Sequence, residues 1–301
     1  MMSSPGPKKV VQLPESPSLG GLYANALKAT ALGAIGLSKR ARTFPDTEYR
    51  VSGLIPDPAK LEGFNRLLHG AGRDSVPAGF VHIMSFPIAL GLMGAEDFPV
   101  PLMGLVHLTN SIDQFRQINP AEPLDFRVRV QNPDTHRAGT QFEIEAEVRA
   151  AGTKELLWQG LSTYLARGVK LGFPEVADER DSFEAPEPNA IWPLGADIGR
   201  RYGAVSGDVN PIHTSSIGAK ALGMKSSIAH GMYLASRALT SALPAGVDAF
   251  RWEAAFATPT FIPGTVAVSI QDIGEPWQRT KYVGWNSRNG KKHFSGSVSP
   301  L

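Results

Sequence analysis

The sequence predicts an α+β protein in which two antiparallel sheets each wrap around a long apolar helix. Apolar and polar residues alternate with period two over 124–130 and 142–148, as in antiparallel strands with one buried face. Long apolar helices are expected at Phe80–Met93 and Ile228–Leu243. Each precedes a group of strands, and a sheet can bury such a helix only by wrapping around it. The repeated order therefore predicts two similar units.

The first elements follow from local signals near the N-terminus. Residues 1–18 are rich in Pro, Ser and Lys and are expected to form a flexible arm. The apolar stretch Gly21–Leu37 is interrupted by polar residues and lacks a basic leader, so it is interpreted as an ordinary helix and not a signal peptide or membrane span. A strand follows at Tyr49–Leu54. Asp57 and Pro58 then fit the N-cap and first position of another helix.

The middle of the chain predicts a meander of strands. Pro87 should kink or break the helix Phe80–Met93. The turn between the two alternating strands is expected within Asn132–Gly139, and Leu156–Leu165 should add a third strand.

The second half repeats this order after a linker. Residues 170–190 are dense in Pro, Glu and Asp with few apolar positions. Beyond them we expect a helix from about Ala196, the apolar helix, and strands near 250, 266, 280 and 292. Such a helix-wrapping sheet is the hotdog arrangement, so the chain is predicted to be a double hotdog. Its predicted parts are an arm at 1–18, hotdogs at 19–169 and 191–301, and a linker at 170–190.

Composition narrows the class of protein. Net charge is +2 over 301 residues, and Arg288–Lys292 is interpreted as a hairpin turn, so no nucleic-acid partner is expected. The chain contains no cysteine, which excludes disulfides, thiolate nucleophiles and cysteine-ligated metal centres. That absence is compatible with a reducing compartment, and we expect a cytoplasmic protein.

The most informative segment is Tyr202–His213. Asp208 and His213 are expected on a short loop stiffened by Pro211, which would aim both side chains into one cleft. A carboxylate and an imidazole together can hold one water, and the reference imidazole pKa of about 6.5 suits proton transfer near neutrality. The pair therefore predicts water activation.

A second feature is the start of the later apolar helix at His230 and Gly231. The first amides of a helix have no intrahelical acceptor, and the helix dipole is positive at that end. Gly231 also permits close approach of a substrate. Its amide is therefore a candidate oxyanion donor for the enolate of a thioester.

Three motifs resemble the MaoC-like family, the (R)-specific enoyl-CoA hydratases of the hydratase 2 type. The resemblance covers about residues 190–301. It implies hydration of trans-2-enoyl thioesters, or the reverse dehydration, in fatty-acid metabolism, with no cofactor or metal. The resemblance assigns water activation to Asp208 and His213, and binding of the thioester oxygen to the Gly231 amide. The motifs are Ser206-Gly207-Asp208 with Asn210, Pro211 and His213; Ala229-His230-Gly231-Met232; and Phe261 with Pro263 and Gly264.

The resemblance also assigns supporting roles and partners. Asn210 is expected to orient the loop or the water, and His230 to be structural at the helix start. Ser206, Gly207 and Pro211 complete the supporting set. The expected partner is a thioester of coenzyme A or of acyl carrier protein, on a monomeric pseudo-dimer or a homodimer with no membrane span.

The N-terminal half departs from this pattern, because nothing like the first motif precedes His82. We expect a degenerate, catalytically silent hotdog. Pro101–Asn110 resembles the non-catalytic half of double-hotdog members, which makes room for a bulky acyl chain. His82 and His107 are expected to be core or pocket residues.

Three alternatives remain open. Asp208, His213 and His230 could form a facial metal triad. A thioesterase could use the same fold, although Ile228–Leu243 contains no Asp or Glu that could serve as a helix carboxylate. The chain could also be a non-enzymatic acyl-binding module, as the degenerate half illustrates.

Overall fold

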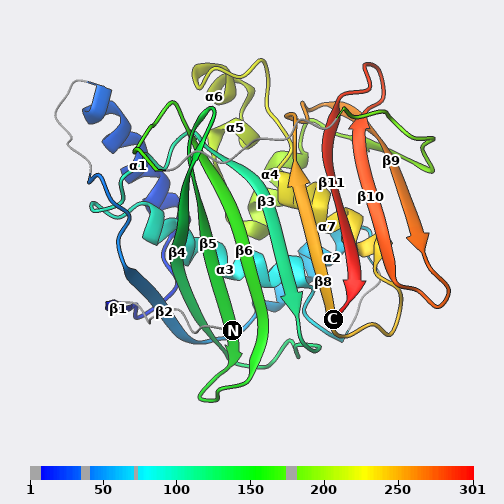
Figure 1. Ribbon diagram of the computed structural model, residues 1–301, viewed down its shortest axis with the longest axis horizontal. Helices are drawn as coiled ribbons and strands as arrows, with labels where there is room; N and C mark the ends of the chain where they lie inside the picture. The colour runs from blue at the N-terminus through cyan, green and yellow to red at the C-terminus, as the bar shows by residue number, and fades with distance from the viewer. Residues whose placement is uncertain (1–7, 35–40, 71–73, 174–181) are drawn as a thin grey trace. The chain divides into compact units, whose positions relative to one another are not determined.

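The computed structural model describes residues 8–34, 41–70, 74–173 and 182–301, and it is an α+β protein as predicted (Figure 1). Its residues group into two compact units. Unit 1 comprises 1–55, 85–107 and 122–178, and unit 2 comprises 56–84, 108–121 and 179–301. Two segments of the predicted first hotdog, 56–84 and 108–121, therefore group with unit 2. The domain boundaries given above stay a prediction.

The sheet of unit 1 has the strand order β1-β2-β4-β5-β6. Its neighbours pair antiparallel, except that β1 lies parallel to β2. The prediction of a flexible arm at 1–18 is therefore wrong for Lys9–Gln12, because the backbone of these residues pairs with Thr47–Arg50. Residues 1–7 lie outside the described part of the chain. The strands are β1 (Lys9–Gln12), β2 (Thr47–Leu54), β4 (Leu124–His136), β5 (Gly139–Ala150) and β6 (Leu156–Arg167).

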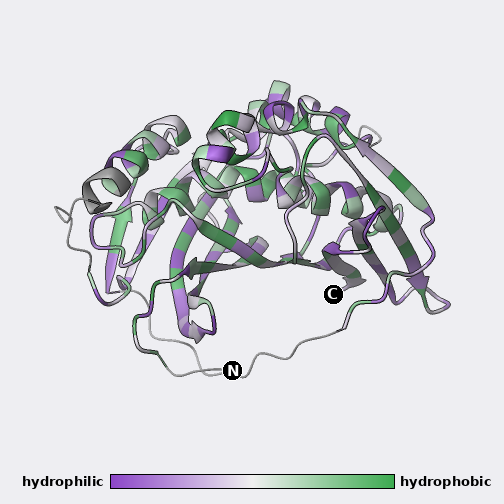
Figure 2. Cartoon of the chain, turned by 90° about the horizontal axis from the view of Figure 1, so that it is seen from above, coloured by the Kyte–Doolittle hydropathy of each residue, from purple (hydrophilic) through white to green (hydrophobic). Residues whose placement is uncertain are grey.

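The strands of unit 1 follow the predicted alternation. Phe126 lies opposite Val148 and both are buried, while Arg129 and Glu145 form an ion pair on the other face. Bands of apolar and polar residues accordingly alternate along the strands (Figure 2). The turn between β4 and β5 lies at 137–138, within the predicted range.

Two helices belong to unit 1 in whole or in part. The first, α1 (Leu19–Ala34), was expected at Gly21–Leu37, of which 35–37 lie outside the described residues. The second, α3 (Ala78–Met93), runs without a break through Pro87, and its residues from Ser85 onward belong to this unit.

The sheet of unit 2 has the strand order β3-β8-β11-β10-β9-β7, with all neighbours antiparallel. The predicted strands near 250, 266, 280 and 292 are confirmed. The sequence did not predict β3 or β7. Pro193 lies in β7, which pairs only along one edge, as expected for a strand containing proline. The strands are β3 (Leu105–Gln114), β7 (Ala190–Leu194), β8 (Phe250–Phe256), β9 (Gly264–Ile273), β10 (Arg279–Asn286) and β11 (Lys292–Pro300).

Helix α7 (Gly231–Ala242) packs against β8, β9, β10 and β11, as expected for a helix wrapped by a sheet. It begins at Gly231 and not at Ile228, because Ile228 forms a bridge with Phe261 and the Ala229 amide bonds to the Thr260 carbonyl. Among the described residues, no helix is long and apolar enough to cross a membrane.

Two shorter helices of unit 2 pack against each other. Asp57 caps α2 (Pro58–Leu67) by accepting from the amides of Ala59 and Lys60, with Pro58 at the first position, which confirms the predicted cap. Helix α2 packs against α4 (Ile198–Ser206), where Phe64 lies beside Tyr202. These contacts hold α4 in place, and the end of α4 carries the candidate site.

A buried hydrogen-bond chain links two strands beneath α7. Trp252 Nε1 donates to the Tyr282 hydroxyl over 2.7 Å, and that hydroxyl donates to the Glu253 carbonyl over 2.6 Å. Tyr282→Phe leaves the indole donor without its acceptor, so we expect the free energy of unfolding to fall by about 1–3 kcal/mol. Urea denaturation measures the change, and an unaltered midpoint and slope would contradict it.

Candidate active site

Helix α4 places the first site residue at its C-terminal end. The buried face of α4 consists of Ile198, Gly199, Tyr202, Gly203 and Ser206, at helical spacing. The helix ends at Gly207, whose φ of 75° is left-handed and whose amide bonds to the Gly203 carbonyl over 2.8 Å. This reversal turns the chain, and Asp208 follows it.

Side-chain hydrogen bonds to the backbone fix the loop that carries Asp208. Ser206 Oγ donates to the Tyr202 carbonyl over 2.8 Å and accepts from the Asp208 amide over 3.1 Å. Asp208 Oδ1 accepts from the Asn210 amide over 3.2 Å. Asn210 Oδ1 in turn accepts from the Ile212 amide over 3.3 Å. Ser206 and Asn210 therefore hold the loop, a role that agrees with their position beside Asp208.

His213 lies on a short helix, not on the loop predicted from the sequence. Asn210 is the N-cap and Pro211 the first residue of α5 (Pro211–Thr214). The predicted loop was wrong at this point because an asparagine followed by proline is itself a helix-start signal. Helix α6 (Ser216–Ala221) follows at once, capped by Ser215. His213 is therefore held on a rigid element.

The ring of His213 has a defined tautomer. Its Nδ1 lies 2.9 Å from the Ile228 carbonyl oxygen, which can only accept, so Nδ1 carries the proton. Nε2 is then the lone-pair nitrogen, free to accept a proton. Burial lowers the pKa of His213, and the opposing effects of Asp208 and the Ile228 carbonyl are smaller. The ring is therefore neutral at pH 7 and suited to act as a base.

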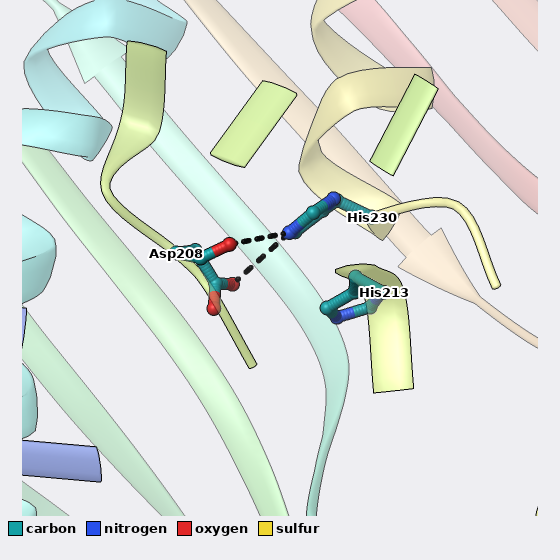
Figure 3. A group of neighbouring side chains, drawn as sticks. All are labelled: Asp208, His213 and His230. Atoms are coloured by element: carbon teal, nitrogen blue, oxygen red, sulfur yellow. Dashed lines mark hydrogen bonds and ion pairs between the residues drawn. The ribbon is translucent and has the colours of Figure 1, made fainter. Parts of the chain in front are cut away.

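His230 connects the start of α7 to the Asp208 loop. Its Nε2 lies 3.0 Å from the Asp208 carbonyl oxygen and 3.6 Å from Asp208 Oδ2 (Figure 3). The rings of His230 and His213 stack with centroids 3.7 Å apart and an interplanar angle of 24°. Burial lowers the pKa of His230 to about 3, helped by His213 and opposed by Asp208. His230 is thus a neutral donor at the helix start.

Asp208, His213 and His230 converge, as Figure 3 shows. One carboxylate oxygen and one ring nitrogen of each histidine all lie within 4.8 Å of one another. The side chain of Asp208 is 17% exposed, and His213 is also partly exposed, so solvent can reach the pair. The geometry can accommodate a water between a carboxylate and a neutral imidazole.

The same three residues fit a metal ion less well. His230 Nε2 already donates to the Asp208 carbonyl, and its Nδ1 is buried without a partner in the described structure. A metal bound through His230 Nε2 would have to break its hydrogen bond to the Asp208 carbonyl. The protonation pattern favours water over a cation at this place.

Gly231 is the first residue of α7. The amides of Gly231, Met232 and Tyr233 precede the first bond into the helix, from Leu234 to the His230 carbonyl. A methyl group added at Gly231 would lie 2.9 Å from the ring of Phe256, so the strand β8 packs directly against this turn. The glycine is required sterically, and its amide is adjacent to the His230 side chain that reaches Asp208.

Two further residues, Tyr202 and His82, have pKa values that respond to the charge of Asp208. The ring of Tyr202 lies 4.7 Å from that of His230, and burial together with Asp208 raises the pKa of Tyr202. His82, buried on α3, has its pKa lowered to about 4 by burial, against a smaller effect of Asp208. The burial of His82 agrees with the core or pocket position expected from the sequence, whereas the contact of Tyr202 with His230 was not predicted, because it arises from tertiary packing.

A separate cavity of about 690 Å³ lies in unit 2 over strands β3, β8, β9, β10 and β11. Phe183 and Pro186 of the predicted linker contribute to its wall. None of Asp208, His213, His230 or Gly231 lines it. The volume of a cavity therefore does not identify the candidate active site. The convergence of polar side chains identifies it.

Comparison with known proteins identifies the family of the chain. The profile of the MaoC-like domain matches residues 184–288, which contain all four site residues. The chain is 30% identical over 279 residues to 3-hydroxyacyl-thioester dehydratase X of Mycobacterium tuberculosis, with 92% of this chain and 97% of that protein covered. The chain belongs to the MaoC-like dehydratase family.

Solved structures place this MaoC-like dehydratase on the expected fold. The crystal structure of the M. tuberculosis dehydratase HtdX superposes with a TM-score of 0.72 at 28% identity, covering 84% of this chain and 100% of HtdX. A MaoC-like dehydratase of Phytophthora capsici has the same fold, with a TM-score of 0.68 at 17% identity over 84% of this chain and 94% of that one. The predicted hotdog fold and hydro-lyase class are confirmed.

The buried histidines of this MaoC-like dehydratase should make its stability depend on pH. His82 and His230 have pKa values of about 4 and about 3, below the unfolded value of about 6.5, so the unfolded state binds more protons. Stability is complete above pH 6.5 and falls as the pH drops toward these values. At pH 5 each group should cost up to about 2 kcal/mol relative to pH 7.

Denaturation at pH 7 and pH 5 measures this effect. His82→Gln should make the pH dependence shallower, whereas His69→Gln, at an exposed position, should leave it unchanged. An identical pH dependence in wild type and His82→Gln would contradict the prediction.

Proposed function

We propose that the protein catalyses the reversible hydration of trans-2-enoyl thioesters to 3-hydroxyacyl thioesters, with Asp208 and His213 as the catalytic pair. The single observation that carries this proposal is the convergence of Asp208 with a neutral His213 whose Nδ1 is held by the Ile228 carbonyl. The relatives' dehydratase activity supports the same reaction class.

In the hydration direction, Asp208 accepts a hydrogen bond from the water and orients it. His213 Nε2 removes its other proton as the oxygen bonds to C3 of the enoyl group. The electrons of the C2–C3 double bond move into the thioester, and a negative charge develops on its oxygen. The protonated His213 then gives this proton to C2, so that the elements of water are added across the double bond and the imidazole returns to its neutral form. Dehydration is the reverse.

Gly231 is proposed to stabilise the enolate oxygen through its amide at the positive end of α7. Backbone donors that are preorganised in this way stabilise charge where it develops. His230, the residue before Gly231, bonds to the Asp208 carbonyl and stacks on His213, which brings both residues to the start of α7. We further propose that the N-terminal hotdog is catalytically silent and accommodates acyl chain.

A thioesterase on the same fold would instead release free thiol from the substrate. The buried face of α7 offers no carboxylate for that reaction, since Gly231–Ala242 contains neither Asp nor Glu. Incubation with acyl and enoyl thioesters, followed by assay of free thiol, distinguishes the two activities. Hydration without thiol release is the expected result.

Two substitutions test the catalytic pair: Asp208→Asn conserves the shape of the side chain, and His213→Ala removes the imidazole. We expect Asp208→Asn and His213→Ala each to lower kcat/KM by about 10²–10⁴, the range typical of a lost general base. The melting temperature should change little for Asp208→Asn, which preserves the acceptor used by the Asn210 amide. Full activity in Asp208→Asn would refute the assignment, and Asp197→Asn on the exposed start of α4 is a matched control.

Gly231 requires a test that separates packing from catalysis. Gly231→Ala keeps the backbone amide but adds a methyl group that clashes with Phe256, so it should displace the amide and lower kcat/KM by up to about 10²–10³, the cost of a lost oxyanion donor. Gly231→Ala combined with Phe256→Leu relieves the clash and lets the amide return, so the melting temperature and kcat/KM should both recover toward wild type. A lowered melting temperature with wild-type kcat/KM in Gly231→Ala would mean that Gly231 serves packing alone.

A further inference from the structure

The outer face of α6 is unusually apolar for an exposed surface. Ile217 is 84% exposed and Leu222, at the end of the helix, is 41% exposed. Ile217, Lys220 and Ala221 lie at positions i, i+3 and i+4 and therefore share one face, while Ala219 on the opposite face is fully buried. A single exposed isoleucine is common on protein surfaces, so Ile217 gains weight here only together with the exposed Leu222 and the charges beside them.

The chain segment that contains this face carries mostly positive charge. Residues 198–247 contain five Lys or Arg and one acidic residue, Asp208, which lies in the site. Lys220 and Lys225 are exposed, and neither forms an ion pair with any residue that the structure describes. The apolar residues are thus flanked by cations that no acidic side chain neutralises. We call Ile217, Lys220, Ala221, Leu222 and Lys225 the α6 surface.

The α6 surface is continuous with the candidate active site. His213 lies on α5, and α6 begins three residues later and packs against α5 (Figure 1). Ser216 Oγ and Ser227 Oγ hydrogen-bond over 2.9 Å, which joins α6 to the segment that leads into α7. A partner seated on α6 would therefore lie beside the segments that supply His213 and Gly231.

We propose that the α6 surface docks an acidic acyl carrier protein, which delivers the thioester to Asp208 and His213. This inference rests on the proposed hydratase function and names its carrier. An acidic helix complements the two lysines, and an apolar side chain on the carrier can cover Ile217 and Leu222. Coenzyme A offers phosphates for the lysines but no surface to cover Ile217, so the exposed isoleucine favours the protein carrier.

The test compares one acyl group on three carriers: acyl carrier protein, coenzyme A and N-acetylcysteamine. We expect Lys220→Glu combined with Lys225→Glu to lower kcat/KM for the carrier-protein substrate at least about tenfold, through loss of charge complementarity. The N-acetylcysteamine substrate should be unaffected. Lys154→Glu, on an exposed turn of unit 1, is the matched charge-reversal control.

Ile217→Ser tests the apolar part without changing charge. It should weaken binding of holo acyl carrier protein in calorimetry while the melting temperature stays constant, because Ile217 is 84% exposed. Binding of the carrier to wild type should also weaken as salt increases.

Other outcomes would overturn the proposal. Equal losses with the carrier protein and coenzyme A would mean that the lysines contact phosphate alone. Equal losses with all three substrates, or salt-independent binding, would mean that the α6 surface is not a docking site. If wild type hydrates none of the three substrates, the proposed function fails, whereas calorimetry with the carrier protein still decides the docking surface.

Discussion

The hydrogen bond between His213 Nδ1 and the Ile228 carbonyl is the interaction on which the site depends. It fixes the tautomer of His213, so that Nε2 presents a lone pair and not a proton. Without this hydrogen bond the ring could adopt either neutral tautomer. In the tautomer with the proton on Nε2, that nitrogen could not accept a proton from water. The bond also ties α5 to the segment before α7, which places a base from one segment beside an amide from another.

A second imidazole makes a similar connection. His230 Nε2 donates to the Asp208 carbonyl, so the start of α7 is attached to the Asp208 loop as well. The two rings stack at 3.7 Å, which neutral imidazoles tolerate and two imidazolium ions would not. Burial lowers the pKa of both rings and keeps them neutral. Burial therefore keeps both rings neutral, while their hydrogen bonds to backbone carbonyls fix the position of each ring at this site.

Much of the fold and the site could be predicted from the sequence, and the exceptions have physical reasons. Period-two alternation marked β4 and β5, and the Asp57-Pro58 signal marked the start of α2. Strands β1 and β7 escaped prediction because short or proline-containing strands depend on their neighbours for pairing. Strand β3 is longer, but its apolar and polar residues do not alternate regularly, so it gave no period-two signal.

The site was predicted at the level of residues but not of contacts. The motif around Asp208 and His213 predicted two residues that the structure brings together, since the residue types and their spacing are local. The contact of His230 with the Asp208 carbonyl and the position of Tyr202 arise from packing of α4 against α7, which no local pattern encodes. The exposure of Ile217 likewise follows from tertiary structure alone.

The most direct measurement is a crystal structure of the Asp208→Asn variant with a 3-hydroxyacyl thioester bound. The account predicts that the substrate hydroxyl lies within hydrogen-bond distance of both His213 Nε2 and the side chain at position 208, with the thioester oxygen at the Gly231 amide. A hydroxyl bound away from His213, or a thioester that occupies another face of unit 2, would contradict it.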